Sequence, residues 1–276
     1  MRRFSAILRE TLFEVLSNKV LIGFFVIAGL GLLAMIIAIN MPETSAKIAR
    51  LQPTPDFPDT AALETFVREW FSISVGFFFY NSFLIVATII TAGLVPSMMR
   101  KGVIDLYLSK PISRTQLLFG KVLGGLIIVL ACIIFFVGGV WLIFGVKTGV
   151  WDTAPLASMF PIMVSFIGMY GILVFIGVTS ESPFLGIIIV FLLAGLVSAM
   201  LANRETTLYG LVPGDIGRTV IDLLYVIMPQ TSESAEIAGD IMYGKTVTNF
   251  FPMIQATFNG LIFFSLAAIS FRRKEF

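Results

Sequence analysis

Six long apolar runs without a single charged residue dominate the chain. A helix needs about 20 consecutive, mostly apolar residues to cross the hydrocarbon core of a membrane. The pattern therefore predicts an all-α integral membrane protein in which residues 1–276 form one six-span transmembrane domain. The predicted transmembrane helices cover residues 20–39, 71–95, 122–146, 156–178, 184–202 and 250–271. Because the number of crossings is even, both termini are expected on the same side of the membrane.

The first 19 residues have the pattern of an amphipathic helix. Their apolar positions recur at helical spacing, whereas most of the charged residues lie off that stripe. This predicts a helix in the membrane interface, and a plain anchor without further function is the simpler interpretation. The apolar stripe consists of Phe4, Ile7, Leu8, Leu12, Val15 and Leu16.

Residues 203–249, between the fifth and sixth runs, are predicted to form an extracytoplasmic or re-entrant segment. They predict short helices, one of which carries an apolar face made by Ile216, Val220, Leu223, Leu224 and Ile227. Arg218 and Asp222 stand four residues apart on that helix, a spacing that predicts an ion pair.

The few charges are distributed unequally between the two sides of the predicted membrane. Only 13% of the residues are charged, the mean hydropathy is +0.96, and the net charge is +2. The segments on the side of the termini hold 12 Lys and Arg against five acids, and the opposite segments hold seven against 12. The positive-inside rule therefore places both termini and the loop at 96–121 in the cytoplasm. The chain is predicted to be a multi-pass protein of the inner (plasma) membrane of a prokaryote.

The composition excludes several kinds of chemistry. The chain has no histidine, so it cannot form a Ser-His-Asp triad, an imidazole acid or base, or a zinc site with histidine ligands. Cys132 is the only cysteine and lies in an apolar run, which excludes an intrachain disulfide and a thiolate cluster. No catalytic residue, no metal ligand, no bound cofactor and no nucleic-acid contact are predicted for this chain.

One motif suggests nucleotide binding and is interpreted as accidental. Residues 239–246 read GDIMYGKT and fit the phosphate-loop pattern G-x-x-x-x-G-K-[ST]. Such a loop follows a buried strand and opens a helix, whereas the preceding residues here are polar and acidic, and Pro252 interrupts the segment that follows.

The cytoplasmic segment 96–116 is the strongest candidate for function. Met99, Val103 and Leu106, with Tyr107 or Leu108, can share one helical face. Pro111 ends that helix, and Ser113 followed by Gln116 predicts a capping box that starts the next one. A simple interfacial connection between two spans is the alternative interpretation.

This segment resembles the cytoplasmic loop of the type 2 ABC transporter (ABC-2) permeases. The resemblance lies in a run of about 22 residues that contains Arg100, Gly102, Leu108, Ser109, Lys110, Pro111, Ile112, Ser113, Arg114, Gly120 and Lys121. The amphipathic start, the six spans and the basic tail FRRKEF agree with it along the whole chain. Family members often carry Glu where this chain has Met99 and Asp105, which leaves open the acidic contacts to a partner.

The resemblance implies that the segment is a coupling helix. In the family this helix docks on a separate cytosolic ATP-binding subunit, present in two copies, and ATP and Mg²⁺ bind to that subunit. The resemblance also implies a second permease subunit, identical or similar to this chain. Membrane lipid is expected to surround the spans. The residues expected to contact the ATPase are Arg100, Gly102, Asp105, Leu106, Leu108, Ser109, Lys110, Pro111, Ser113 and Arg114.

The predicted spans contain few polar side chains. Asn81, Gln255 and Asn259 could line a translocation path or form hydrogen bonds between helices. Buried carboxylates of the kind that drive proton-coupled transport are absent from the six runs, so the energy is expected to come from a partner. The chain is thus predicted to be the permease subunit of an ABC exporter. The alternatives are a non-transporting subunit that transmits ATP-driven motion to a membrane or periplasmic partner, and a membrane-embedded enzyme that modifies lipids.

Overall fold

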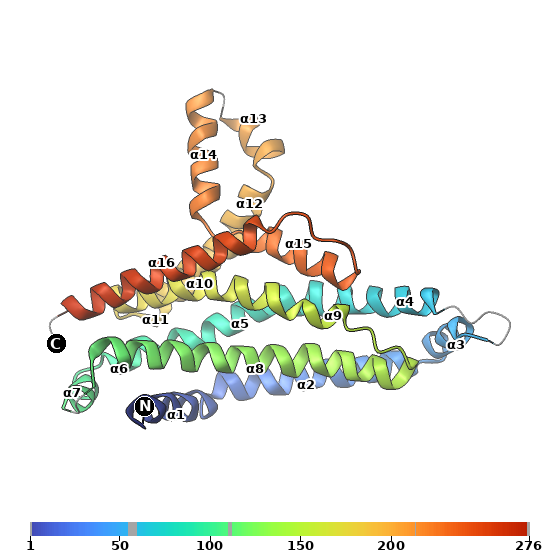
Figure 1. Cartoon of the computed structure of the whole chain (residues 1–276), viewed down its shortest axis with the longest axis horizontal. Helices are drawn as coiled ribbons and strands as arrows, with labels where there is room; N and C mark the ends of the chain where they lie inside the picture. Colours follow the sequence, from blue (N-terminus) through green and yellow to red (C-terminus); the bar gives the residue numbers. More distant parts are fainter. Residues whose placement is uncertain (1, 55–59, 110–111, 213, 275–276) are drawn as a thin grey trace.

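The computed structural model describes residues 2–54, 60–109, 112–212 and 214–274, and its regular structure is helical. Five of its helices are long and apolar enough to cross a membrane: Lys19–Asn40, Arg114–Thr148, Ala154–Ser180, Pro183–Ala202 and Phe251–Arg273. They lie side by side along the long axis of the molecule, with the two termini at the same end (Figure 1). The chain is therefore a multi-pass membrane protein.

The second predicted span has a different form from the other five. Its apolar residues begin inside a longer helical stretch made of α4 (Ala61–Phe71), the π-helical segment η1 (Ser72–Tyr80) and α5 (Asn81–Ala92). After Gly93 comes the short helix α6 (Leu94–Met98). Within this stretch only residues 82–98 form an apolar α-helical piece, which is shorter than the five others. The expected regular helix over 71–95 is thus replaced by a helix that widens in its middle.

The remaining predicted spans match single or nearly continuous helices. The first is α2 (Lys19–Asn40), the third is α8 (Arg114–Thr148), and the sixth is α16 (Phe251–Arg273). The fourth is formed by α9 (Ala154–Ala157) and α10 (Met159–Ser180). The fifth is formed by α11 (Pro183–Phe191), the π-helical segment η2 (Leu192–Val197) and α12 (Ser198–Ala202).

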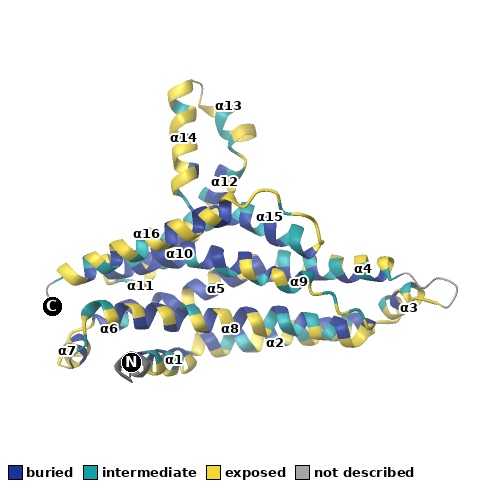
Figure 2. Ribbon diagram, viewed as in Figure 1, coloured by how far each residue is buried: buried dark blue, intermediate teal, exposed yellow. Residues whose placement is uncertain are grey.

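The central helix of the bundle is α10, the most buried of the five candidate spans. It crosses α16 at glycines, because a Cβ atom added to Gly171 would lie 2.7 Å from the carbonyl oxygen of Gly260. Small residues permit such close backbone approach between membrane helices. Figure 2 shows the buried positions along α10, whereas the outward faces of α2 and α16 carry exposed apolar side chains, as expected for helices in contact with lipid.

The termini and connections add short helices at both ends of this bundle. The N-terminal helix α1 (Arg2–Leu16) packs on α8, and α7 (Val103–Leu108) lies near the same end. The helix α3 (Pro42–Leu51) lies at the opposite end (Figure 1). Residues 203–249 form the π-helical turn η3 (Arg204–Leu208), α13 (Tyr209–Leu211), α14 (Asp215–Ile227) and α15 (Thr231–Met242). Short helices in this segment were predicted from its polar and apolar pattern.

Candidate functional site

The predicted coupling segment consists of α6, a glycine turn, α7 and the start of α8. The turn depends on Gly102, whose φ of 84° and ψ of −35° are unfavourable for any residue with a Cβ atom. The carboxylate of Asp105 accepts a hydrogen bond from the Gly102 amide at 3.2 Å and fixes the start of α7. At the start of α8, Ser113 accepts from the Gln116 amide at 3.2 Å and donates its own amide to the Gln116 side chain at 3.3 Å. The predicted capping box is confirmed.

The apolar residues of this segment are divided between two faces. Met99 and Tyr107 are buried, whereas Val103 is exposed and the Leu106 side chain is 62% exposed. The single apolar face expected from the spacing is therefore wrong, because the protein itself covers one half of it. The exposed half also carries Arg100, Lys101, Asp105 and Ser109. The side chain of Leu108, and the residues Lys110 and Pro111, lie outside the described part of the chain.

The buried face of the coupling segment rests on α1. The hydroxyl of Tyr107 donates a hydrogen bond to the carboxylate of Glu10. Burial raises the pKa of Tyr107, and the hydrogen bond to Glu10 raises it further, so this hydroxyl remains a proton donor at neutral pH. One turn further along α1, Glu14 accepts a hydrogen bond from Ser97 of α6 at 2.8 Å and pairs with Lys121 of α8. The N-terminal helix is thus bound to α6, α7 and α8 at once.

Close packing accompanies these polar contacts. Thr11 is fully buried, and a Cβ atom added to Gly124 of α8 would lie 2.5 Å from the Thr11 methyl group. Gly120 and Gly124 stand four residues apart, a spacing of small residues that indicates close helix packing but does not identify α1 as the partner. Glu10 and Glu14, spaced four apart, were the available signal, and they were interpreted only as the polar side of an interfacial helix.

The C-terminal tail completes the connections at this end. Arg114 donates hydrogen bonds to the carbonyl oxygens of Lys274, at 2.5 Å, and Arg272, at 3.3 Å. The ammonium of Lys274 pairs with Glu181, 2.7 Å away, in the connection between α10 and α11. The first residue of α8 is thereby linked to α16 and to α10.

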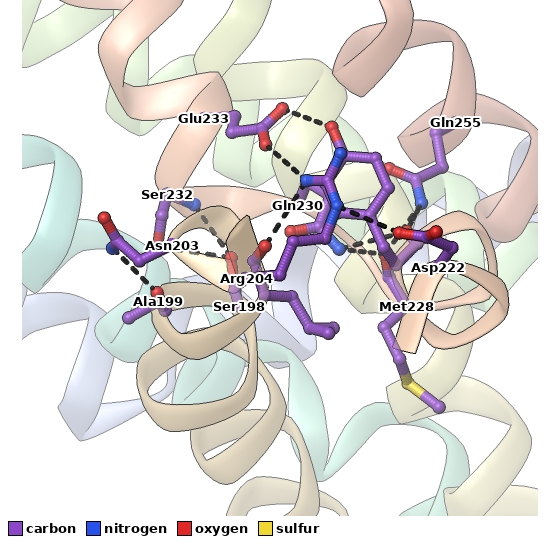
Figure 3. Close-up of polar contacts among 12 residues, drawn as sticks. Ser198, Ala199, Asn203, Arg204, Asp222, Met228, Gln230, Ser232, Glu233 and Gln255 are labelled. Atoms are coloured by element: carbon purple, nitrogen blue, oxygen red, sulfur yellow. Dashed lines mark hydrogen bonds and ion pairs between the residues drawn. The ribbon is translucent and has the colours of Figure 1, made fainter. Parts of the chain in front are cut away.

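A second polar cluster lies where α12, α14 and α15 meet (Figure 3). Arg204 pairs with Asp222 at 3.3 Å, and its guanidinium lies 3.6 Å from the centre of the Tyr225 ring. The Tyr225 hydroxyl donates to Glu233 at 2.7 Å. Burial raises the pKa of Tyr225 to about 12, and the bond to Glu233 contributes. The predicted pair of Arg218 with Asp222 is wrong, because Arg204 comes from η3 and takes that place, while Arg218 lies over the ring of Tyr209.

The two amides of the sixth predicted span hold the end of α14. Gln255 donates to the carbonyl oxygens of Val226, at 2.7 Å, and Met228, at 2.9 Å, and Asn259 donates to that of Ile227 at 2.8 Å. Gln255 also donates to the carbonyl oxygen of Tyr225. Helix C-termini leave carbonyl groups without an intrahelical partner, and these amides satisfy those of Tyr225, Val226 and Ile227. Of the two roles considered for Gln255 and Asn259, the structure shows hydrogen bonding between helices. Asn81 begins α5, and its side chain is outside the described part.

The segment with the phosphate-loop pattern has the wrong local structure for a nucleotide. The helix α15 occupies residues 231–238, where a phosphate loop requires a preceding strand, and continues through residues 239–242, where the loop itself is required. Lys245 pairs with Asp240 at 3.0 Å instead of pointing into a cradle of backbone amides. Among the described residues, no group of three or more Cys, Asp and Glu side chains is placed to hold a metal ion.

Comparison with known families agrees with the layout of the chain. The family model described as "ABC-2 family transporter protein" matches residues 7–276. No curated protein sequence matches the chain. The matched range includes α7, the start of α8 and the polar cluster around Arg204.

Proposed function

The chain belongs to the ABC-2 family of transporter proteins, and from this premise we propose that it is the permease subunit of an ATP-driven exporter. Two copies of a cytosolic ABC ATPase subunit, carrying ATP and Mg²⁺, supply the energy, and a second permease subunit completes the membrane path. The six predicted runs cross the plasma membrane of a prokaryote, with both termini and the segment 96–116 in the cytoplasm.

The observation that carries this proposal is the exposed face of α7. Leu106 and Val103 are exposed beside Arg100, Lys101 and Asp105. An apolar centre with charged neighbours is suited to a protein interface, because the apolar side chains supply buried area and the charges set orientation. The inward face of the same helix is already covered by α1 through Tyr107 and Glu10.

The connections of α7 suit it to pass movement into the membrane. Five residues separate α7 from the capped helix α8, which is 35 residues long, or about 52 Å. A rigid element of that length carries a displacement at one end to the other. Glu14, Lys121 and Arg114 join its first turns to α1 and to the C-terminal tail, so a displaced α7 moves several helices together.

Co-purification with the ATPase tests the proposal. We expect the tagged chain, produced together with a cytosolic ABC ATPase subunit of the same organism, to retain that subunit in detergent. Leu106→Asp places a charge in the centre of the exposed face and should abolish retention while the fold persists, because this side chain is 62% exposed. Met41→Asp, a change to the same charged residue at an exposed apolar position between α2 and α3, is the control and should retain the ATPase.

Two results would contradict the proposed coupling role. The first is a wild-type chain that retains no ATPase subunit. The second is a Leu106→Asp variant that retains as much ATPase as the wild type and supports equal ATP-dependent movement of substrate in liposomes.

A further inference from the structure

The segment η3–α13–α14, residues 204–227, projects away from the helix bundle as an arm (Figure 1). Among the described residues, its hydrogen bonds to α16 lie in the last turn of α14, at Tyr225, Val226 and Ile227. At the base of the arm, Ile221 and Tyr225 form a small buried cluster with Leu201 of α12. The base of the arm is therefore held by hydrogen bonds to α16, whereas the part beyond it packs on residues of the arm itself.

Most of the arm's apolar surface is uncovered in a single chain. The side chain of Ile216 is 84% exposed and that of Leu223 is 58% exposed. Figure 2 shows exposed positions along the length of α14. A helix of 13 residues is marginally stable by itself. Further burial is needed to hold this helix in place.

Neither water nor lipid alone suits this surface. In water alone, the apolar side chains of the arm stay exposed to solvent. In hydrocarbon alone, the exposed charged groups of Glu205, Asp215 and Arg218 lose their hydration, which is costly. A protein surface with both apolar and charged groups covers the arm without either cost.

A surface of that kind lies beside the root of the arm on the same chain. An open cleft of about 810 Å³ is bounded by the base of the arm, by α15 and by residues 246–252. Four carboxylates line it, together with a single guanidinium, that of Arg204. Arg204 is already paired with Asp222, and Asp240 is paired with Lys245. Two acids of the cleft, Glu205 and Glu236, are exposed. Neither forms an ion pair with any residue that the structure describes.

The helix α14 carries one exposed cation in addition to the exposed acid Asp215. Arg218 is exposed on α14, and its guanidinium lies 5.6 Å from the centre of the Tyr209 ring. It forms no ion pair with any residue that the structure describes. An exposed cation on the projecting arm and two exposed carboxylates in the cleft are complementary, and two copies related by a two-fold axis make this contact twice.

We propose that two copies of this chain exchange their arms, each arm packing into the acidic cleft of the other copy with its Arg218 beside Glu205 and Glu236 of that copy. The inference rests on the proposed function in one respect, namely that two permease subunits assemble. It adds the surface through which they assemble and the charges that orient them. The apolar residues of α14 are then covered by the partner and not by lipid.

Charge reversal tests the exchange. The oligomeric state is measured in nanodiscs and, over a range of protein-to-lipid ratios, by energy transfer between labelled copies in liposomes. We expect Arg218→Glu to weaken the dimer by about tenfold or more, and Glu236→Arg to do the same. The combination of both changes in one chain should restore part of the lost affinity, because positions 218 and 236 regain opposite charges while Glu205 still faces a like charge. Arg50→Glu, at an exposed arginine on α3, is the control and should leave the dimer unchanged.

A crosslink between different copies gives a second measurement. One population carries Arg218→Cys and the other carries Glu236→Cys, both with the buried Cys132 replaced by Ala, so only a contact between copies joins them. We expect covalent dimers in the mixture and few in either population alone.

Several outcomes would overturn the exchange. Dimers that withstand both charge reversals show that another face joins the copies, and a combined variant as weak as the single ones removes the proposed pairing. A wild-type chain that stays monomeric at every protein-to-lipid ratio shows that lipid covers the arm. Retention of the ATPase is measured on the tagged chain irrespective of dimer formation, so these outcomes leave the coupling role of α7 standing.

Discussion

The ammonium group of Lys121 on α8 pairs with the carboxylate of Glu14 on α1. Only 2% of the Lys121 side chain is exposed, whereas 37% of the Glu14 side chain is exposed. Lys121 also lies 5.7 Å from the centre of the Tyr107 ring, so this single cation contacts both the N-terminal helix α1 and the helix α7. The pair joins three elements at the end of the bundle that holds both termini.

The difference in exposure predicts unequal effects of the two single substitutions. Glu14→Gln leaves a buried ammonium without its counter-charge and should cost about 3–5 kcal/mol of unfolding free energy. Lys121→Met leaves a carboxylate that water still reaches and should cost clearly less. Thermal unfolding in detergent micelles measures both variants and the combined variant, which should be more stable than Glu14→Gln alone.

The exposed pair of Lys245 with Asp240 is the control for that experiment. Lys245→Met should change the stability by less than about 1 kcal/mol, since both partners are well exposed. Equal losses for Glu14→Gln and Lys121→Met would contradict the assignment of Lys121 as the buried member.

Much of the architecture could be predicted from the sequence because membrane helices are specified by local composition. Uncharged runs of about 20 residues located five of the helices, and Ser113 with Gln116 located the start of α8. The widened helix at 72–80 was not foreseen, because a π-helical segment and an α-helix present the same apolar composition.

The partners of polar side chains could be predicted far less well. The spacing of Arg218 and Asp222 allowed a pair within one helix, but Arg204, 18 residues away in the chain, reaches Asp222. Gln255 and Asn259 were recognised as unusual residues of a span, yet their targets lie on α14, about 30 residues earlier. Such contacts depend on how separate helices are arranged, which no local pattern contains.

Loss of the amides of α16 should loosen the arm. Gln255→Leu leaves the carbonyl oxygens of Val226 and Met228 without this donor and should cost about 1–3 kcal/mol. Hydrogen exchange of amides 222–229 should become faster, while that of α10 stays unchanged. Ser265→Ala is the control, because the Ser265 hydroxyl bonds only within its own helix, to Leu261. The side-chain amide of Gln230 also donates to the carbonyl oxygens of Tyr225, at 3.0 Å, and Met228, at 3.1 Å. Unchanged exchange in Gln255→Leu would show that these bonds from Gln230 suffice to hold this end.

The crossing of α10 and α16 should not tolerate a methyl group at its centre. In Gly171→Ala the new Cβ atom would lie 2.7 Å from the carbonyl oxygen of Gly260, so one backbone must move. Overpacking of this kind should cost about 1–3 kcal/mol in thermal unfolding. Gly29→Ala in α2, where a Cβ atom meets nothing within 4 Å, should be neutral or slightly stabilising. Equal stability of the two variants would mean that the helices are farther apart than the structure shows.

The turn at Gly102 should control the position of α7. Its φ of 84° makes Gly102→Ala unfavourable by about 1–2 kcal/mol even though the added Cβ atom would touch nothing. The cost therefore falls on the local backbone, and we expect faster hydrogen exchange in residues 99–109 with little change in the melting temperature of the bundle. Gly93→Ala, at a glycine with φ of −77° and equally free space, is the matched control and should leave the exchange unchanged.

If the ATPase docks on α7, Gly102→Ala should also weaken its retention, whereas Gly93→Ala should not. Full retention of the ATPase together with fast hydrogen exchange at residues 99–109 would show that the ATPase binds without α7 being ordered beforehand.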